Sequence, residues 1–261
     1  MIPVESVNIF KAAIALLKDP ANIAKTTGEV MVQSIGSTTK DEFQFGEAFA
    51  ANFLGHYLLL KELEGVLEKT TKLLKDENRG WEGARVIWLT SDTAEHHMFD
   101  PNDIMCLKGA YPYESSKRLI ELIHLETAAR LREKGIYSVV ANPGISATDV
   151  MKGTVPTWLI LVALYFFRFC FLPAVCITPF NASRSEAYLA IEVTDPNELN
   201  PKTVYQSDVT FWGTSRVRKL VLRREGVMDC SADVCTNGNV DLTKIREEVD
   251  AIYNRVKKVS A

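Results

Sequence analysis

The sequence has too little of several features that would mark particular protein classes. Its 5 cysteines form no CxxC pair, and an odd count suits a reducing compartment better than a disulfide framework. Lys+Arg 30 and Asp+Glu 33 nearly cancel, which argues against a protein that mainly binds nucleic-acid phosphates. The first residues lack a basic stretch ahead of an apolar core, so no secretory signal is visible. The 14 Gly and 10 Pro among 261 residues exclude a collagen-like or disordered chain.

The histidines offer no metal site. None of the four has the spacing to cysteine or carboxylate residues that a zinc site requires. They are His56, His96, His97 and His124. We therefore expect no bound metal.

Alternating strand and helix patterns predict the fold class. The runs 85–91 and 137–142 are short, apolar and bounded by glycine or polar residues, as buried parallel strands are. Apolar side chains at helical spacing cover 41–75 and 113–134. Later patterns predict a helix opened by a capping box at 183–186, a strand at 203–206 and an amphipathic helix at 242–256. This order predicts an α/β fold of one domain over 1–261, a Rossmann-like parallel sheet with flanking helices.

One segment is much more apolar than the rest of the chain. Residues 158–177 contain one charged residue, Arg168, and one helix breaker, Pro173. The length approaches that of a membrane-spanning helix, but an arginine in mid-segment favours a helix that lies in one leaflet. The alternative is a buried core helix with Arg168 at its rim. We predict a membrane-associating helix, because it has more aromatic residues than ordinary soluble helices and lacks their polar stripe.

The basic stretch 216–224 faces either anionic lipid or only solvent.

A tyrosine followed four residues later by a lysine is the first sign of catalytic chemistry. Such a pair is expected about once by chance in a chain of this composition, so its position must decide. Three pairs occur, at Tyr57/Lys61, Tyr113/Lys117 and Tyr253/Lys257. Only the pair of Tyr113 and Lys117 begins a helix between two buried strands, and only it has a hydroxyl residue, Ser91, ending the preceding strand. Parallel sheets place their chemistry at the carboxyl ends of strands.

These three side chains match the requirements of ketone reduction. The reaction needs a hydride on carbon and a proton on oxygen. A phenol becomes a usable acid when an ammonium group one helical turn away favours its anion, so Lys117 can activate Tyr113 while also reaching a ribose. Ser91 can donate a hydrogen bond to the same carbonyl oxygen. The turn at 142–144 can approach a flat cofactor ring closely.

The sequence around these residues resembles the short-chain dehydrogenase/reductase family. Tyr113-Glu-Ser-Ser-Lys117, the upstream Thr90-Ser91 and the downstream segment 142–148 carry the resemblance. The segment 52–58 is similar to the family's helix that supplies an active-site asparagine. More narrowly, residues 85–145 resemble the sterol 3-keto-reductases of C-4 demethylation, including the separation of 22 residues between Ser91 and Tyr113.

The resemblance implies a role for each matching residue. Tyr113 is the acid, Lys117 its activator and ribose ligand, and Ser91 the hydroxyl that orients the carbonyl. Asn52 holds the water that relays a proton towards Lys117. Cofactor contacts come from Tyr113, Lys117, Pro143, Gly144, Ile145 and Thr148. The alternatives are Asn52 as a buried polar group that bends its helix, and Ser91 as a strand-end cap.

The resemblance also implies a reaction and a location. The reaction is the NADPH-dependent reduction of a 3-keto-sterol to the 3β-hydroxy sterol. The partners are a sterol or steroid ketone, a membrane surface and other enzymes of sterol C-4 demethylation, with no nucleic acid. The location is the cytosolic face of the endoplasmic reticulum membrane, with the lipid droplet as an alternative.

One departure from the family pattern is serious. The family opens with a strand and a turn, Thr-Gly-x-x-x-Gly-x-Gly, whose N–H groups bind the cofactor diphosphate, and nothing in the sequence fits it. We therefore expect an N-terminally truncated sheet and poor NADPH binding. Two other functions stay open: a catalytically inactive remnant that acts as an interaction protein of a sterol-pathway complex, and a reductase of a specialised triterpenoid.

Overall fold

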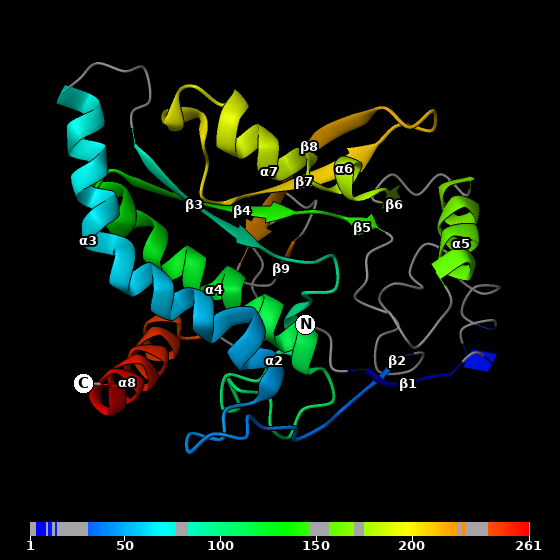
Figure 1. Ribbon diagram of the computed structural model, residues 1–261, viewed down its shortest axis with the longest axis horizontal. Coiled ribbons are helices and arrows are strands. Elements are labelled where there is room, and N and C mark those ends of the chain that lie inside the picture. Colours follow the sequence, from blue (N-terminus) through cyan, green and yellow to red (C-terminus); the bar gives the residue numbers. More distant parts are fainter. Residues whose placement is uncertain are drawn as a thin grey trace.

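A five-stranded sheet forms the centre of the fold. The computed structural model describes residues 4–8, 10–11, 14, 31–76, 83–146, 157–169, 175–223, 226–227 and 240–260. The strands follow the order β3-β4-β7-β8-β9 (Figure 1). They are β3 (Ala84–Leu89), β4 (Ile136–Asn142), β7 (Thr203–Val209), β8 (Ser215–Arg223) and β9 (Gly226–Val227). β3, β4 and β7 run parallel, which confirms the predicted Rossmann-like parallel sheet for this part, whereas β8 and β9 continue it antiparallel.

β4, the middle one of the three parallel strands, is covered on both faces, as its continuous apolar sequence predicts. Ile136 and Val140 point into a core shared with the long helices, whereas Val139 and Ala141 point into a second core on the opposite face. β3 forms one edge of the sheet and is only half-buried, and Leu89 at its end is exposed. Among the described strands, the sheet therefore has a covered centre and an edge at β3, which pairs only with β4.

Helices cover both faces of the sheet. In Figure 1, α4 (Pro112–Glu133) and α8 (Leu242–Ser260) lie below the strands, and the short helix α7 (Arg184–Ala187) lies above them. A further run joins the core of α4 and α8 and consists of α2 (Glu47–Phe49), the π-helix η2 (Ala50–Leu54) and α3 (Gly55–Asp76). α7 continues into the π-helix η5 (Tyr188–Glu192), whose Leu189 is fully buried against β4.

One predicted helix start is wrong, and another is right but lacks the predicted cap. The helix expected from residue 41 begins at Glu47, because the Asp41 carboxylate accepts hydrogen bonds from the N–H groups of Phe43 and Gln44 and holds a turn there. The helix expected to open at 183–186 does begin there, since α7 starts at Arg184 with Ser183 as its N-cap residue, but the Ser183 side chain makes no capping hydrogen bond. Ser183 donates to the carbonyl of Phe180 instead, since a short helix, α6 (Pro179–Ala182), precedes it directly.

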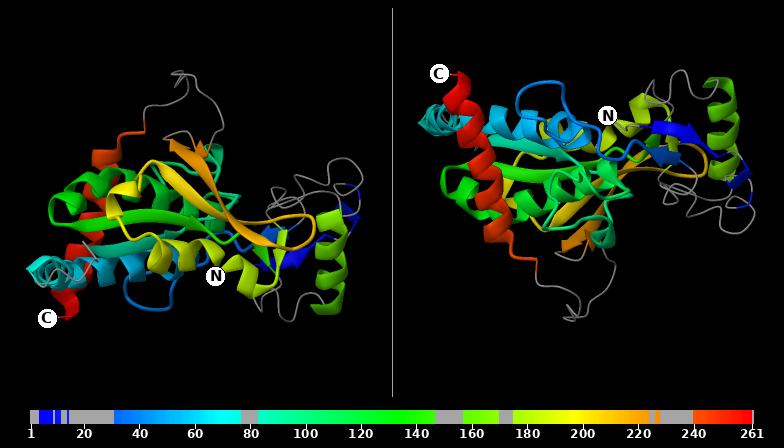
Figure 2. Two further views of the ribbon diagram at one scale, coloured as in Figure 1. Left: turned by 90° about the horizontal axis from the view of Figure 1, so that it is seen from above. Right: turned by 90° about the horizontal axis from the view of Figure 1, so that it is seen from below.

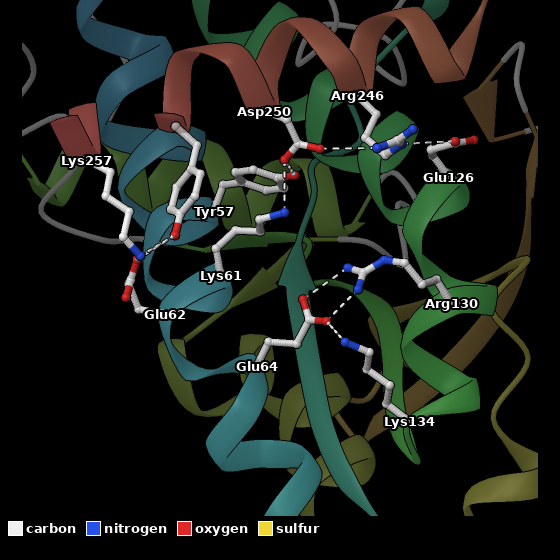
Figure 3. A network of polar contacts seen from close by, with 11 residues as sticks. Tyr57, Lys61, Glu62, Glu64, Glu126, Arg130, Lys134, Arg246, Asp250 and Lys257 are labelled. Atoms are coloured by element: carbon white, nitrogen blue, oxygen red, sulfur yellow. Dashed lines mark hydrogen bonds and ion pairs between the residues drawn. The ribbon is translucent and has the colours of Figure 1, made fainter. Parts of the chain in front are cut away.

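A network of ion pairs connects the three long helices (Figure 3). Glu64 on α3 binds Arg130 and Lys134 on α4, the latter at 2.6 Å. Asp250 on α8 accepts from the Tyr57 hydroxyl at 2.8 Å. Glu64 is buried, but Arg130 and Lys134 stay more than a third exposed, so water weakens these ion pairs to about 0–1 kcal/mol each. The network therefore mainly fixes the orientation of helices that the apolar core holds together.

The apolar segment is not one continuous helix. α5 (Thr157–Phe169) is 13 residues long, and Val175–Ile177 form the buried strand β6, which pairs with β5 (Ile145–Ser146). The prediction that residues 158–177 form one apolar helix is therefore wrong at its C-terminal end, because β5 offers Val175–Ile177 backbone partners. Among the described residues, no helix combines the length and the apolar character that crossing a bilayer requires.

The remaining elements are short. They are the antiparallel pair β1 (Val4–Val7) and β2 (Met31–Gln33), and the single turns of 3₁₀-helix η3 (His96–Met98) and η6 (Pro196–Glu198). Gln33 of β2 is buried and reaches the start of α4, where its side chain donates to Glu114 at 2.7 Å and accepts from the Tyr113 N–H at 3.0 Å. The β1–β2 pair is thus anchored next to the predicted site.

Candidate active site

The predicted site lies where the carboxyl ends of β3 and β4 meet the start of α4. Thr90 and Ser91 follow β3 directly, and Asn142 ends β4. α4 begins with Pro112 in its first turn, a position that needs no backbone donor, and this places Tyr113 in the same turn. The Ser91 hydroxyl lies close enough to the Tyr113 phenol to lower the pKa of that phenol. The structure therefore brings together two hydroxyls that are 22 residues apart in the sequence.

Lys117 completes this group from one helical turn further along α4. Its Nζ lies 5.7 Å from the centroid of the Tyr113 ring and donates to the Leu89 carbonyl oxygen at 3.0 Å. Burial lowers the pKa of Lys117 from 10.5 to about 8, because the charged ammonium loses much of its water. Tyr113, Lys117 and Ser91 thus form one cluster, as the sequence predicts, while their catalytic roles stay predictions.

The pKa of Tyr113 is shifted in the direction opposite to the sequence expectation. Burial raises it, the hydrogen bond from Ser91 opposes that rise, and the carboxylates of Glu114 and Asp92 add to it. The expected depression by Lys117 is not what the geometry gives, since the ammonium is bound to the Leu89 carbonyl and faces the tyrosine ring.

Asn52 lies on a different element but is connected to the same cluster. It sits in the π-helix η2, is buried, and donates through Nδ2 to Ser116 Oγ at 3.0 Å. Ser116 Oγ in turn donates to the Tyr113 carbonyl oxygen at 2.6 Å. Short π-helical turns inside α-helices occur frequently at functional sites. The location agrees with both sequence readings of Asn52, as a site residue and as a polar group that distorts its helix.

Asp92 is a site residue that the sequence reasoning missed. Its Oδ1 accepts from Asn142 Nδ2 at 2.7 Å and from Gln206 Nε2 at 2.8 Å, so it joins the loop after β3 to the end of β4 and the middle of β7. Asn142 Oδ1 accepts from the Gly144 N–H at 2.9 Å, which holds the turn after β4. The available signal was that β4 ends in the polar residue Asn142 and that Gln206 of β7 is its direct neighbour in the sheet.

The predicted cofactor contacts are only partly assembled. Pro143, Gly144 and Ile145 are half-buried beside the cluster, and Gly144 has φ +66°, a conformation that favours glycine. Thr148 lies outside the described residues.

The donors of Tyr113 and Lys117 fit the ribose and nicotinamide end of a dinucleotide, whereas the sequence has no glycine-rich turn for its diphosphate. In the part of the chain that the structure describes, no cluster of metal ligands occurs.

A cavity of about 530 Å³ extends along the open edge of β3. Asn52 and Lys117 contribute to its wall, and the rest of the lining is mostly apolar and comes from α3 and β3. Leu59 and Leu63 of α3 line it and remain exposed. An unpaired apolar strand edge is the place where a sheet can accept another strand.

Comparison with known proteins gives three informative relatives. The chain is 33% identical over 196 residues to a 3-keto-steroid reductase/17-beta-hydroxysteroid dehydrogenase 7 of Rattus norvegicus. The aligned region covers 74% of this chain and 54% of the relative. The Homo sapiens protein of the same name is 30% identical over 195 residues, 74% of this chain and 53% of the relative. A 3-keto-steroid reductase of Yarrowia lipolytica is 26% identical over 224 residues, 84% of this chain and 61% of the relative.

These matches confirm the resemblance but cover only part of each relative. The chain spans about half of the mammalian proteins' length and somewhat more of the yeast protein's. No family model matches the chain. Over most of its own length, the chain is a sequence relative of the 3-keto-steroid reductases.

Proposed function

We propose that the protein reduces the 3-ketone of a sterol to a 3β-hydroxyl, using NADPH. The observation that carries the proposal is the cluster of Tyr113, Lys117 and Ser91, which combines a phenol, an ammonium and a second hydroxyl at the carboxyl edge of a parallel sheet. The names of the relatives supply the class of ketone.

Each side chain of the cluster has a distinct task in this proposal. The nicotinamide cofactor would supply the hydride. Tyr113 would give its phenolic proton to the developing alkoxide, and Ser91 would hold the same oxygen by a hydrogen bond. Lys117 would stabilise the phenolate that remains and bind the ribose. Its lowered pKa keeps the proton of Lys117 exchangeable near neutral pH, and Asn52 would connect it to solvent through a bound water.

We also propose a location at the cytosolic face of the endoplasmic reticulum membrane, with the lipid droplet as an alternative. α5 would hold the protein on the bilayer, where a sterol ketone dissolves. Other enzymes of sterol C-4 demethylation would be its neighbours. The exposed apolar side chains of α5 support this location, since a soluble surface rarely carries so many together.

One feature of the sequence favours a second function. Because the sequence offers no glycine-rich turn for the cofactor diphosphate, the chain would bind NADPH poorly. A protein that retains the fold but not the reaction would act as an interaction partner within a sterol-pathway complex. A reductase of a specialised triterpenoid uses the same cluster and differs only in substrate.

Two assays separate these functions. We expect titration with NADPH, followed by nucleotide fluorescence, to give binding weaker than low micromolar. At millimolar NADPH, the chain should convert a detergent-solubilised 3-keto-sterol to its 3β-alcohol, identified by mass spectrometry. Conversion of a triterpenoid ketone in preference to the sterol would change the substrate. Absence of conversion of either ketone would favour the interaction protein.

A further inference from the structure

Among the α5 side chains that the structure describes, an apolar row is packed and another apolar row is exposed. Leu161 and Leu164 pack against Val175 and Ile177 of the β6 strand. A separate row carries exposed large side chains at positions i, i+4, i+7, i+8 and i+11, which is one helix face. They are Trp158, Val162, Tyr165, Phe166 and Phe169, and Trp158 is 66% exposed.

The turn between β7 and β8 extends this apolar face. The Thr210 N–H donates to the Thr214 carbonyl at 2.9 Å and the Gly213 N–H to the Thr210 carbonyl at 2.9 Å, which closes a tight turn. Gly213 has φ +91°, a conformation that glycine permits. Phe211 and Trp212 occupy the middle of the turn. Trp212 is 88% exposed, so its indole contributes little packing to the described fold.

Helix and turn lie side by side, as both views in Figure 2 show. The ring centroids of Phe169 and Phe211 are 5.9 Å apart, and those of Phe211 and Trp212 are 5.1 Å apart. Together the exposed residues of α5 and the turn form one aromatic surface, defined by Trp158, Val162, Tyr165, Phe166, Phe169, Phe211 and Trp212.

Arg168, the only charged residue of α5, contacts the backbone of the turn. Its Nη2 donates to the Thr210 carbonyl at 3.3 Å, and its guanidinium lies so close to Gly213 that a Cβ there would require the arginine to shift. The arginine thus joins the helix to the turn. This contact makes the aromatic surface a two-part structure.

The charges beside the aromatic surface indicate what it binds. Residues 209–223 contain no acidic residue, and β8 carries Arg216 and Arg218 on one face, whereas Lys219 lies over the Tyr205 ring on the other face. Arg216 and Arg218 pair with the buried Asp208, yet both side chains stay about half exposed. Tryptophan and tyrosine beside basic residues are typical of the boundary between acyl chains and anionic headgroups.

We propose that the aromatic surface is a two-part membrane anchor, in which the β7–β8 turn inserts beside α5 into a bilayer that contains anionic lipid. The inference rests on the membrane location proposed above and adds the turn, with Trp212 as its leading residue, and the preference for anionic headgroups. Arg168 holds the two parts at a fixed angle, so they enter the interface together.

The test is co-sedimentation of the full chain with phosphatidylcholine vesicles, with and without phosphatidylserine. We expect tighter binding to the vesicles with phosphatidylserine, and about tenfold or greater weakening by Trp212→Glu, since withdrawing one large aromatic from the interface is sufficient for that. Phe166→Glu should weaken binding similarly. Leu73→Glu is the matched control, because Leu73 is 61% exposed near the end of α3, far from α5 (Figure 1). Circular dichroism should show the same fold for all variants.

Each other result overturns the inference in a recognisable way. If Phe166→Glu weakens binding but Trp212→Glu does not, α5 binds the membrane alone. If the parent binds neither vesicle, or if light scattering shows a dimer that Trp212→Glu dissociates, another molecule covers the surface. Conversion of the detergent-solubilised sterol ketone is measured on the same preparations, so failure of the anchor is distinguished from failure of the proposed reaction.

Discussion

Lys117 should reduce the stability of the folded protein at neutral pH. Burial lowers its pKa from 10.5 to about 8. Between these values the unfolded chain retains the proton that the folded chain has released, so the free energy of unfolding rises with pH in this window. At about 1.4 kcal/mol per pKa unit, the full change is about 3 kcal/mol, and water that reaches the partly exposed ammonium reduces it to about 2 kcal/mol.

Urea unfolding of the parent and Lys117→Met, at about pH 7 and about pH 10, measures this change. The variant loses the hydrogen bond to the Leu89 carbonyl at both pH values, so the informative quantity is the change with pH. The parent should gain about 2 kcal/mol relative to the variant on going to the higher pH. Lys108→Met, which removes an exposed lysine, serves as the control. If the free energy of unfolding changes equally with pH in the parent and in Lys117→Met, the reasoning is refuted.

Two other changes test the surroundings of the site. Glu64, whose pKa Arg130 and Lys134 lower to about 2, contributes stability that is present above pH 4.5 and is lost as the pH falls towards 2. Glu64→Gln should therefore flatten the acid limb of thermal unfolding curves, and an unchanged limb would contradict this. Asp92→Ala should destabilise by about 2–4 kcal/mol in urea, because two buried amides lose their acceptor, whereas Asp92→Asn retains an acceptor and should cost less. Equal losses in both variants would show that the charge, and not the acceptor, matters.

The parts of the fold that could be predicted depend on patterns local in sequence. β3, β4 and α4 follow from short apolar runs and helical periodicity, and the cluster of Tyr113, Lys117 and Ser91 follows because strand ends and a helix start meet at one sheet edge. The direction of the Tyr113 pKa shift could not be predicted in the same way. The shift depends on how deeply Tyr113 is buried and on which acceptor the Lys117 ammonium binds.

The parts that were missed depend on contacts between distant segments. β8 was taken for a basic stretch, because Arg216 and Arg218 conceal its alternation until Asp208 and Gln206 of the neighbouring strand are placed beside them. β6 was taken for helix, since an apolar run of this length does not distinguish a buried strand from a helix. Asp92 has no motif of its own, and its role depends on the register of β4 and β7.

The rate of ketone reduction by Tyr113→Phe tests the central claim most directly. In single turnovers with 3-keto-sterol at millimolar NADPH, the phenylalanine variant should be about 100-fold slower or more, because acid catalysis typically contributes 10²–10⁴. Its dissociation constant for NADPH should stay close to that of the parent. Tyr111→Phe, two residues earlier and outside the cluster, should react at the parental rate. A Tyr113→Phe rate within about tenfold of the parent's would contradict the assignment of Tyr113 as the proton donor.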